Sequence, residues 1–309
     1  MTHQSQEPSH ARGGGQFRSG FCAIVGRPNV GKSTLLNRVV GQKVTIVSDK
    51  PQTTRNKIQC VWTTPQAQIV FLDTPGIHRP YDRLGERMVE TALEALKEVD
   101  VILMMVDGAG GPGKGDEEVA AQLAQLSSDV LLVINKMDLV PASKREQAVA
   151  AFSTLGKFAG VLPISAVTGE GVDKLLERLI EMLPPGPKYF PDDWLTDHPE
   201  QFVVAELIRE KALMLTREEV PYAIAVVVER MGKRPNKDLV DIEATIFVER
   251  ESQKGIIIGK GGSRLKEIGS LARREIEALL GSPVYLQLWV KVNPGWRDKE
   301  SALRALGYM

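Results

Sequence analysis

The chain has 309 residues, which is enough for two domains with hydrophobic cores of their own. Its 39 basic and 39 acidic residues cancel, so the overall charge selects no partner and any surface for nucleic acid must be local. No stretch approaches the roughly 20 apolar residues of a membrane-spanning helix, and residues 1–20 lack the apolar segment of a secretory signal. We therefore expect a cytoplasmic protein with a flexible tail at 1–20 and buried, reduced thiols at Cys22 and Cys60.

Residues 26–33 match the phosphate-binding pattern G-x-x-x-x-G-K-[ST], preceded by a short apolar strand at 21–25 and followed by a helix start. In this context the backbone N–H groups of the loop and of the helix N-terminus can hold phosphate oxygens. We predict that Lys32 neutralises the β- and γ-phosphates and that Ser33 offers its hydroxyl to Mg²⁺. The residues predicted to line this loop are Gly26, Arg27, Pro28, Asn29, Val30, Gly31, Lys32, Ser33 and Thr34.

Residues 47–57 are polar and without periodicity, which predicts a mobile loop. Thr53 and Thr54 both lie in it, and one of them should reach Mg²⁺ when a bound triphosphate closes the loop. Spacing does not decide between the two; we favour Thr54, which precedes Arg55.

A hairpin pair of strands is predicted at 58–62 and 68–72, and the second strand runs into the sequence Asp-Thr-Pro-Gly. An aspartate at the end of such a strand can hold Mg²⁺ through water, which gives the metal ligands Ser33, Thr54 and Asp73. Gly76 would let the backbone approach the γ-phosphate. The residues expected on this side of the site are Asp73, Thr74, Pro75, Gly76 and Ile77.

Buried strands at 101–106 and 130–134 follow a helix at 88–98, and the second strand leads into Asn-Lys-Met-Asp. Asp138 can accept two hydrogen bonds from guanine, whereas adenine has no donor at N1. Asn135 would tie the base loop to the phosphate loop, and Lys136 would lay its stem over the base. The next strand, at 161–164, is followed by Ser165 and Ala166, where a backbone N–H can donate a hydrogen bond to guanine O6. The residues predicted to bind the base are Asn135, Lys136, Met137, Asp138, Ser165 and Ala166.

Strands that alternate with helices predict an α/β fold with a doubly wound, mainly parallel sheet and ligand loops at the carboxyl ends of the strands. A helix at 172–183 ends at two prolines. We expect a nucleotide-binding domain at 21–183 and a proline-rich linker at 184–200.

The remainder, 201–309, has the order helix, strand, strand, helix, helix, strand, which predicts a smaller α+β domain. Residues 259–262 fit G-x-x-G between two helices, the loop with which KH modules clamp single-stranded nucleic acid. Residues 250–274 hold seven basic and two acidic side chains, a net charge of +5. The three isoleucines at 256–258 would form the floor of a groove for unstacked bases. The predicted RNA-binding residues are Lys254, Ile257, Ile258, Gly259, Lys260, Gly261, Gly262, Ser263 and Arg264. The alternative is a solvated helix face beside a tight turn.

The motifs GRPNVGKS, PQTTR, DTPGI and NKMD, followed by IIIGKGG, resemble those of the Era family of GTPases over nearly the whole chain after residue 20. The resemblance implies a Ras-like P-loop NTPase domain followed by a type II KH domain, and GTP hydrolysis that is slow and stimulated by RNA. It also implies binding to the 3′ end of 16S rRNA, a role in assembly of the 30S subunit, and sometimes peripheral contact with the inner face of the cell membrane. We expect a monomer. The Gly-rich stretch after Val106 is the main departure from the family pattern.

Many Ras-like GTPases carry a water-orienting glutamine where this chain has Ile77, whose side chain cannot form hydrogen bonds. Slow intrinsic hydrolysis is therefore expected. We predict that Asn29 helps to hold a K⁺ ion in the place of an arginine finger; the alternative is that Asn29 only stiffens the loop. The catalytic candidates are thus Lys32, Thr54 and Asn29.

Two functions are left open by the sequence. In the first, GTP orders the loops at 47–57 and 76–90 and so biases how the second domain presents its groove. In the second, the protein is an RNA chaperone whose nucleotide site mainly stabilises the fold. A third function, that of an ATP-dependent enzyme, conflicts with Asp138.

Overall fold

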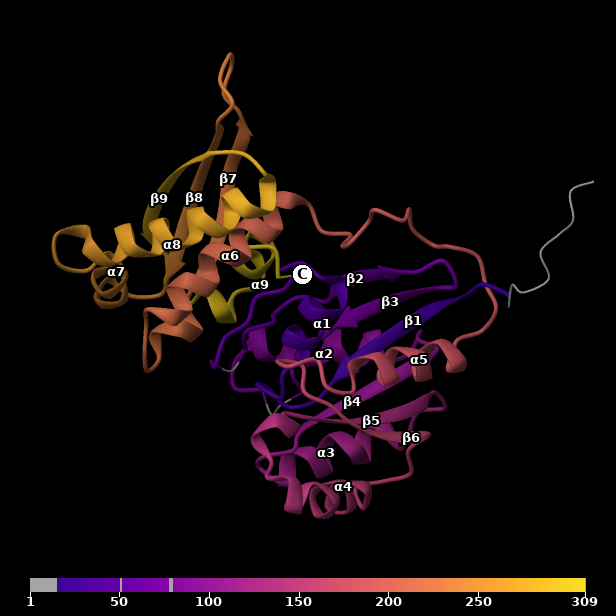
Figure 1. The fold of residues 1–309 in the computed structure, drawn as a ribbon. Helices are drawn as coiled ribbons and strands as arrows, with labels where there is room; N and C mark the ends of the chain where they lie inside the picture. Colours follow the sequence, from indigo (N-terminus) through magenta and orange to yellow (C-terminus); the bar gives the residue numbers. More distant parts are fainter. Residues whose placement is uncertain (1–15, 51, 78–79, 309) are drawn as a thin grey trace, which may run out of the picture.

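The computed structural model describes residues 16–50, 52–77 and 80–308, which form two domains (Figure 1). Most of the expected N-terminal tail, residues 1–15, lies outside this part of the chain. No helix in the described residues is long and apolar enough to cross a membrane. Cys22 and Cys60 are both buried free thiols, as predicted.

The first domain is built on a six-stranded sheet in the order β2-β3-β1-β4-β5-β6. The β2–β3 pair is antiparallel and the other pairs are parallel, which confirms the predicted doubly wound sheet. Its elements are β1 (Arg18–Val25), α1 (Lys32–Val40), β2 (Ile58–Thr63), β3 (Ala67–Asp73), α2 (Arg83–Ala95), β4 (Val101–Asp107), α3 (Lys114–Leu123), β5 (Asp129–Asn135), α4 (Arg145–Ser153), β6 (Gly160–Pro163) and α5 (Val172–Met182).

Strand β4 shows why the chain folds this way. Leu103 and Met105 point into the apolar cluster under α1 and α5, while Met104 and Val106 point into the cluster under α2, α3 and α4. Because successive side chains of a strand alternate between faces, a continuous apolar run is needed when helices cover both. The carboxyl ends of the parallel strands then meet at one edge, where the ligand loops begin.

The predicted C-terminal boundary of the tail, residue 20, was wrong. Strand β1 begins at Arg18, three residues before the predicted start, because Arg18 pairs with Ala67 of β3. Ser19 is fully buried, and its N–H donates to the carbonyl of Pro184. The linker after α5 therefore lies against the first strand.

The linker follows a defined path along the first domain. The carboxamide of Gln68 accepts hydrogen bonds from the N–H groups of Tyr189 and Phe190 and donates to the carbonyl of Phe190. Farther on, the N–H of Val61 donates to the carbonyl of Leu195. These contacts fix the point at which the second domain starts.

The second domain has a three-stranded sheet in the order β7-β8-β9, with β7–β8 antiparallel and β8–β9 parallel. Its elements are α6 (Glu200–Met214), β7 (Ala225–Lys233), β8 (Val240–Val248), α7 (Glu251–Ile258), α8 (Ser263–Leu280), β9 (Val284–Val292) and α9 (Glu300–Ala305). Helices α6, α7 and α8 share one apolar cluster with one face of the sheet. The predicted order of elements up to β9 is confirmed.

Helix α9 was not predicted. Leu303 of α9 and Trp296, in the turn before it, pack with Val227 of β7 on the opposite face of the second sheet. The same cluster includes Leu84 and Met88 of α2, so the C-terminal end lies where the two domains meet (Figure 1). The chain after β9 thus forms part of the contact between the domains.

Candidate functional site: a nucleotide cleft and a nucleic-acid groove

The phosphate loop curls around the buried amine of Lys32. Its Nζ donates to the carbonyls of Gly26 and Arg27 at 3.2 and 3.1 Å. A Cβ on Gly26 would lie 2.2 Å from the carbonyl oxygen of Met105, in a backbone with φ of +152°, so the first position of the motif must be glycine. Burial lowers the pKa of Lys32 to about 8, although nearby Asp73 opposes this effect. Bound phosphates would favour the charged amine.

Three oxygen-bearing side chains meet beside this loop. The hydroxyls of Ser33 and Thr54 lie 3.3 Å apart, and each lies within hydrogen-bond distance of Asp73 Oδ2, at 3.2 and 3.3 Å. Asp73 is fully buried, and its Oδ1 has no hydrogen-bond partner within the described residues. Burial raises the pKa of Asp73 to about 6, despite the charge of Lys32 and these hydrogen bonds. Hard oxygen donors with an unpaired buried oxygen fit Mg²⁺.

The structure distinguishes the two threonines of the loop at 47–57. The Thr53 hydroxyl donates to the carbonyl of Lys50 at 2.6 Å, away from Ser33 and Asp73. Thr54 is 8% exposed and points at that pair. This arrangement supports Thr54 over Thr53 as a metal ligand.

The segment after β3 lies close to the phosphate loop. The Thr74 hydroxyl donates to the carbonyl of Ile24 at 2.8 Å, and Pro75 is buried. A Cβ on Gly76 would lie 3.0 Å from the backbone N of Pro28, so glycine permits this approach. Ile77 is buried in the cluster under α2 and therefore does not face the cleft as a water-orienting residue would.

The base loop shows one confirmed prediction and one correction. Asn135 is buried and its amide donates to the carbonyl of Val30, as expected. The Nζ of Lys136 pairs with Asp107 at 2.5 Å and Lys136 lines the cleft, so the placement of its stem over the base stays a prediction. Met137 was expected to contact the base, but its side chain is buried in the core. The Met137 N–H donates to the carbonyl of Ile164, directly after β6, so Met137 stabilises the loop from its core side.

The two backbone N–H groups predicted for guanine O6 have protein partners in this structure, and their role toward the base stays a prediction. The N–H of Ser165 donates to the carbonyl of Glu170 at 2.9 Å, and the N–H of Ala166 donates to Asn135 Oδ1 at 2.8 Å. Both donors are therefore engaged by protein acceptors. Asp138 is exposed beside them and free to meet a base.

The Gly-rich stretch after β4 accommodates Arg27. The Arg27 guanidinium pairs with buried Asp116 at 2.9 Å, and a Cβ on Gly115 would lie 2.6 Å from Arg27 Cδ. Asp116 also accepts the N–H of Gly113. It caps helix α3 from inside its first turn.

The cleft is wider than the motifs predicted. A pocket runs from the phosphate loop to the loop before Thr54, and its lining includes Ile46, Val47, Ser48 and Asp49 in addition to predicted residues such as Asn29 and Thr34. The Asn29 amide donates to the carbonyl of Asp49 at 2.6 Å and so joins the two loops. These residues carry no motif of their own, and only the fold places them here.

The G-x-x-G turn of the second domain leaves its outer side open. A Cβ on Gly259 would lie 3.0 Å from the backbone N of Arg264, so this glycine serves the turn itself. A Cβ on Gly261 or Gly262 would meet nothing within 4 Å, and both residues have positive φ. The open side can therefore admit another backbone, as a nucleic-acid clamp requires.

The groove beside this turn differs from the predicted one. Successive helical residues point about 100° apart, so three consecutive isoleucines cannot share one face. Ile257 is fully buried in the domain core and does not line a groove, whereas Ile256 is 38% exposed and Ile258 half-buried. The groove instead runs between α8 and β9, and it is lined by Gly262, Leu265, Lys266, Gly269, Ser270, Arg273, Tyr285, Leu286 and Leu288.

Comparisons with known proteins agree with this geometry. Residues 21–136 match the family described as "50S ribosome-binding GTPase", and residues 219–297 match the KH domain. The GTPase Era of Alkaliphilus oremlandii is 52% identical over 292 residues, which cover 94% of this chain and 99% of that protein. The GTPase Era of Alkaliphilus metalliredigens is 51% identical with the same coverage.

Two solved structures resemble the whole chain. One is the crystal structure of Era in complex with MgGDPNP and nucleotides 1506–1542 of 16S ribosomal RNA, at 46% identity and a TM-score of 0.91. The other is a variant of Aquifex aeolicus Era bound to GDP and AlF4⁻, at 45% identity and a TM-score of 0.91. Each comparison covers 94% of this chain and 99% of the other. A Ras-like GTPase domain followed by a KH domain, with these relatives, shows that the chain belongs to the Era family of GTPases.

Proposed function

We propose that this protein uses GTP binding and hydrolysis to control its grip on single-stranded RNA, and that its RNA is the 3′ end of 16S rRNA during assembly of the 30S subunit. The observation that carries the proposal is the open groove between α8 and β9 beside the G-x-x-G turn. The solved relative bound to nucleotides 1506–1542 of 16S ribosomal RNA supports this choice of RNA.

In the nucleotide cleft, Ser33 and Thr54 would hold Mg²⁺ through their hydroxyls, and Asp73 would hold it through water. Bound Mg²⁺ supplies charge neutralisation at the β- and γ-phosphates. Lys32 would add a second positive charge there. Asp138 would select guanine, because it accepts two hydrogen bonds that adenine cannot donate.

In the RNA groove, side chains of two kinds support binding. Lys266 and Arg273 of α8 can pair with phosphates, while Tyr285 of β9 is 48% exposed and can stack with a base. Lys260 adds charge at the open side of the turn. Helix α8 begins directly after the turn, at Ser263, and no side chain of the described residues caps its N-terminus, so its first backbone N–H groups can bind phosphate. We propose that Lys254, Ile258 and Arg264 flank this site.

The test reverses charge at the turn. A chain with Lys260→Asp and Gly261→Asp should bind a single-stranded oligonucleotide of the 16S 3′ end at least about 10-fold more weakly at physiological salt. Fluorescence anisotropy measures the dissociation constant. Lys174→Asp, an exposed charge reversal on α5, is the matched control. Equal affinity of the turn variant and the control would contradict RNA binding at this groove.

A second experiment separates the switch from a chaperone with a structural nucleotide site. Lys32→Ala should abolish GTP binding, since it removes the amine that the loop encloses. If that variant still supports 30S assembly in cells, the switch is contradicted and the chaperone is favoured.

The remaining proposals concern the surroundings of the protein. We propose that Asn29 helps to hold K⁺ beside the β- and γ-phosphates. We propose that the protein acts as a monomer in the cytoplasm, with peripheral contact at the inner face of the cell membrane as an additional prediction. Sedimentation of the purified chain tests the monomer. Fractionation of cells in low and high salt tests the membrane contact.

A further inference from the structure

The loop that carries Thr54 is fastened to the second domain on both sides of that residue. Before it, the carbonyl of Thr53 accepts a hydrogen bond from the guanidinium of Arg209, a fully buried residue of α6. After it, Arg55 is only 4% exposed and extends into the second domain. The loop expected to be mobile is therefore held here by contacts from another domain.

The binding place of Arg55 is a box of carbonyls and aromatic rings. Its guanidinium donates to the carbonyls of Ile224 and Tyr222 at 2.6 and 3.0 Å. Its Cζ lies 5.7 Å from the ring centroid of Trp296 and 5.5 Å from that of Tyr308, and these two rings stack 5.6 Å apart. Such contacts attract a cation through the ring quadrupole.

No carboxylate among the described residues lies within salt-bridge distance of Arg55 in this box, although Glu206 of α6 is near enough to favour its charged form. Burial lowers the pKa of its guanidinium. A buried cation without a paired carboxylate regains its hydration when it leaves, so its release costs less than breaking a buried ion pair. This composition suits a contact that opens and closes.

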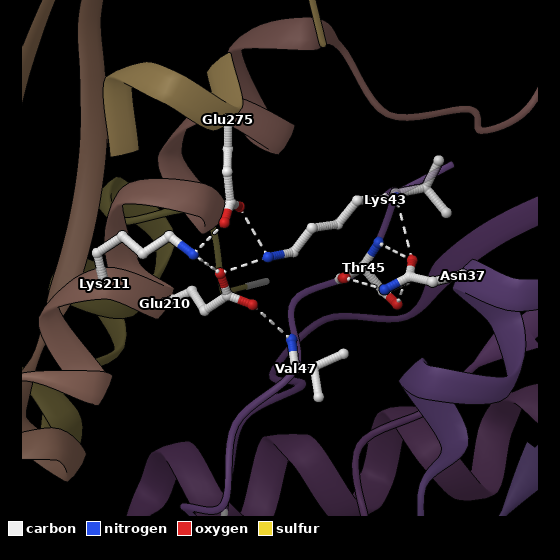
Figure 2. A network of polar contacts seen from close by, with 8 residues as sticks. Asn37, Lys43, Thr45, Val47, Glu210, Lys211 and Glu275 are labelled. Carbon is white, nitrogen blue, oxygen red and sulfur yellow. Dashed lines mark hydrogen bonds and ion pairs between the residues drawn. The ribbon is translucent and has the colours of Figure 1, made fainter. Parts of the chain in front are cut away.

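A second set of contacts connects the start of the same loop to the RNA-binding helix. Glu210 of α6 accepts the N–H of Val47 at 2.9 Å (Figure 2). Lys43 bridges Glu210 and Glu275 at 2.6 and 2.7 Å, and Lys211 pairs with both carboxylates from the other side. Glu275 lies on α8, the helix that starts at the G-x-x-G turn. The loop around Thr54 thus touches the second domain at several points.

We propose that Arg55 is a positioning residue for GTP hydrolysis, and that Trp296 and Tyr308 hold it so that the Thr54 hydroxyl stays at Ser33 and Asp73. The C-terminal segment after β9 then completes the GTPase site from another domain. Any movement of the second domain, including one caused by RNA in its groove, would change the position of Thr54 through this contact. The inference rests on the proposed role of Thr54 toward Mg²⁺.

The test uses the full-length chain and a matched pair at Tyr308, which is remote in sequence from the nucleotide motifs. Tyr308→Ala removes the ring, whereas Tyr308→Phe keeps the ring and loses only a 3.4 Å hydrogen bond to Arg55. With a non-hydrolysable GTP analogue and Mg²⁺, Tyr308→Ala should speed hydrogen exchange of the amides at 52–57 by at least about 10-fold. Its kcat should fall by about 10-fold with little change in KM. Tyr308→Phe should match the wild type in both measurements.

Variants at Arg55 give an independent reading. Arg55→Ala should reproduce the effects of Tyr308→Ala, and Arg55→Lys, which keeps a cation over the rings, should restore part of the lost kcat. If Tyr308→Ala lowers the melting temperature but leaves exchange at 52–57 and kcat unchanged, Arg55 is only a structural contact and the proposal is overturned. Thr54→Val is measured in parallel. If that change alone leaves kcat intact, the role of Thr54 toward Mg²⁺ fails, whatever Arg55 does.

Discussion

The carboxamide of Asn135 joins the base loop to the phosphate loop, because its Nδ2 donates to the carbonyl of Val30 at 2.8 Å. Its Oδ1 accepts the N–H of Ala166 at the same distance. A Cβ on Gly31 would lie 2.3 Å from that Nδ2, so the neighbouring position in the loop has no room for a side chain. One buried amide therefore holds together the loops that follow β1, β5 and β6.

Asn135→Ala should weaken binding of GDP and GTP alike. The change leaves the Val30 carbonyl and the Ala166 N–H unpaired, at about 1–3 kcal/mol for each buried group. We expect both affinities to fall by about 10- to 100-fold, since both nucleotides use the same loops. Titration with a fluorescent guanine nucleotide measures this, with Asn293→Ala in the second domain as control. A loss confined to GTP would contradict a role in holding the loops together.

Asp138→Asn should convert guanine preference into xanthine preference. The carboxylate accepts from guanine N1–H and the exocyclic amine, whereas an asparagine places a donor there that suits the carbonyl of xanthine. We expect GTP affinity to fall by at least about 100-fold and affinity for xanthosine triphosphate to rise. Asp129→Asn, an exposed aspartate at the start of β5, is the matched control. Equal affinity of the wild type for ATP and GTP would contradict guanine selection by Asp138.

Patterns that are continuous in sequence predicted the structure well. The predicted order of helices and strands from α6 to β9 is the observed one, because the apolar residues of each element recur with that element's own period. The motifs around Lys32 and Asn135 placed the nucleotide cleft correctly, since the carboxyl ends of parallel strands share one edge.

Features that depend on contacts between distant segments were not predicted. Arg55 is buried although it lies in a polar stretch, because its partners come from the segment between α6 and β7 and from the C-terminal segment. Tyr285 and Leu288 line the groove only because β9 pairs with β8 beside α8. Ile257 was misassigned, since a run of three isoleucines does not tell which one faces inward.

The domain contact around Glu275 should weaken in acid. Burial alone would raise the pKa of Glu275, but hydrogen bonds from Lys211 and Lys43 outweigh it and hold the pKa below its ordinary value. A carboxyl whose pKa is lower in the folded state stabilises the fold above its unfolded pKa of about 4.3 and loses this contribution as pH falls through the folded value. The stabilising effect is therefore present at neutral pH and lost below about pH 4.

Urea unfolding of the wild type and Glu275→Gln tests this pH dependence. At pH 7 the variant should be less stable by about 1 kcal/mol or less, because Glu275 is partly exposed and its pairs are screened by solvent. The difference should shrink toward pH 3. Glu267→Gln, an exposed change of the same kind on α8, should show no such trend. A difference that grows in acid would mean that Glu275 is held by other forces.

Hydrolysis should be faster in K⁺ than in Na⁺ if Asn29 helps to hold the cation. Asn29 has a left-handed backbone, φ +66°, and its amide donates to the Asp49 carbonyl, which leaves Oδ1 available to a cation. At equal ionic strength we expect about a 10-fold higher kcat in K⁺, because a fixed cation stabilises charge that develops on the phosphates. Asn29→Gly preserves the backbone conformation and should remove the difference. Asn236→Gly, at an exposed position with φ +59°, should retain it. Identical rates in K⁺ and Na⁺ for the wild type would leave Asn29 the simpler role of joining two loops.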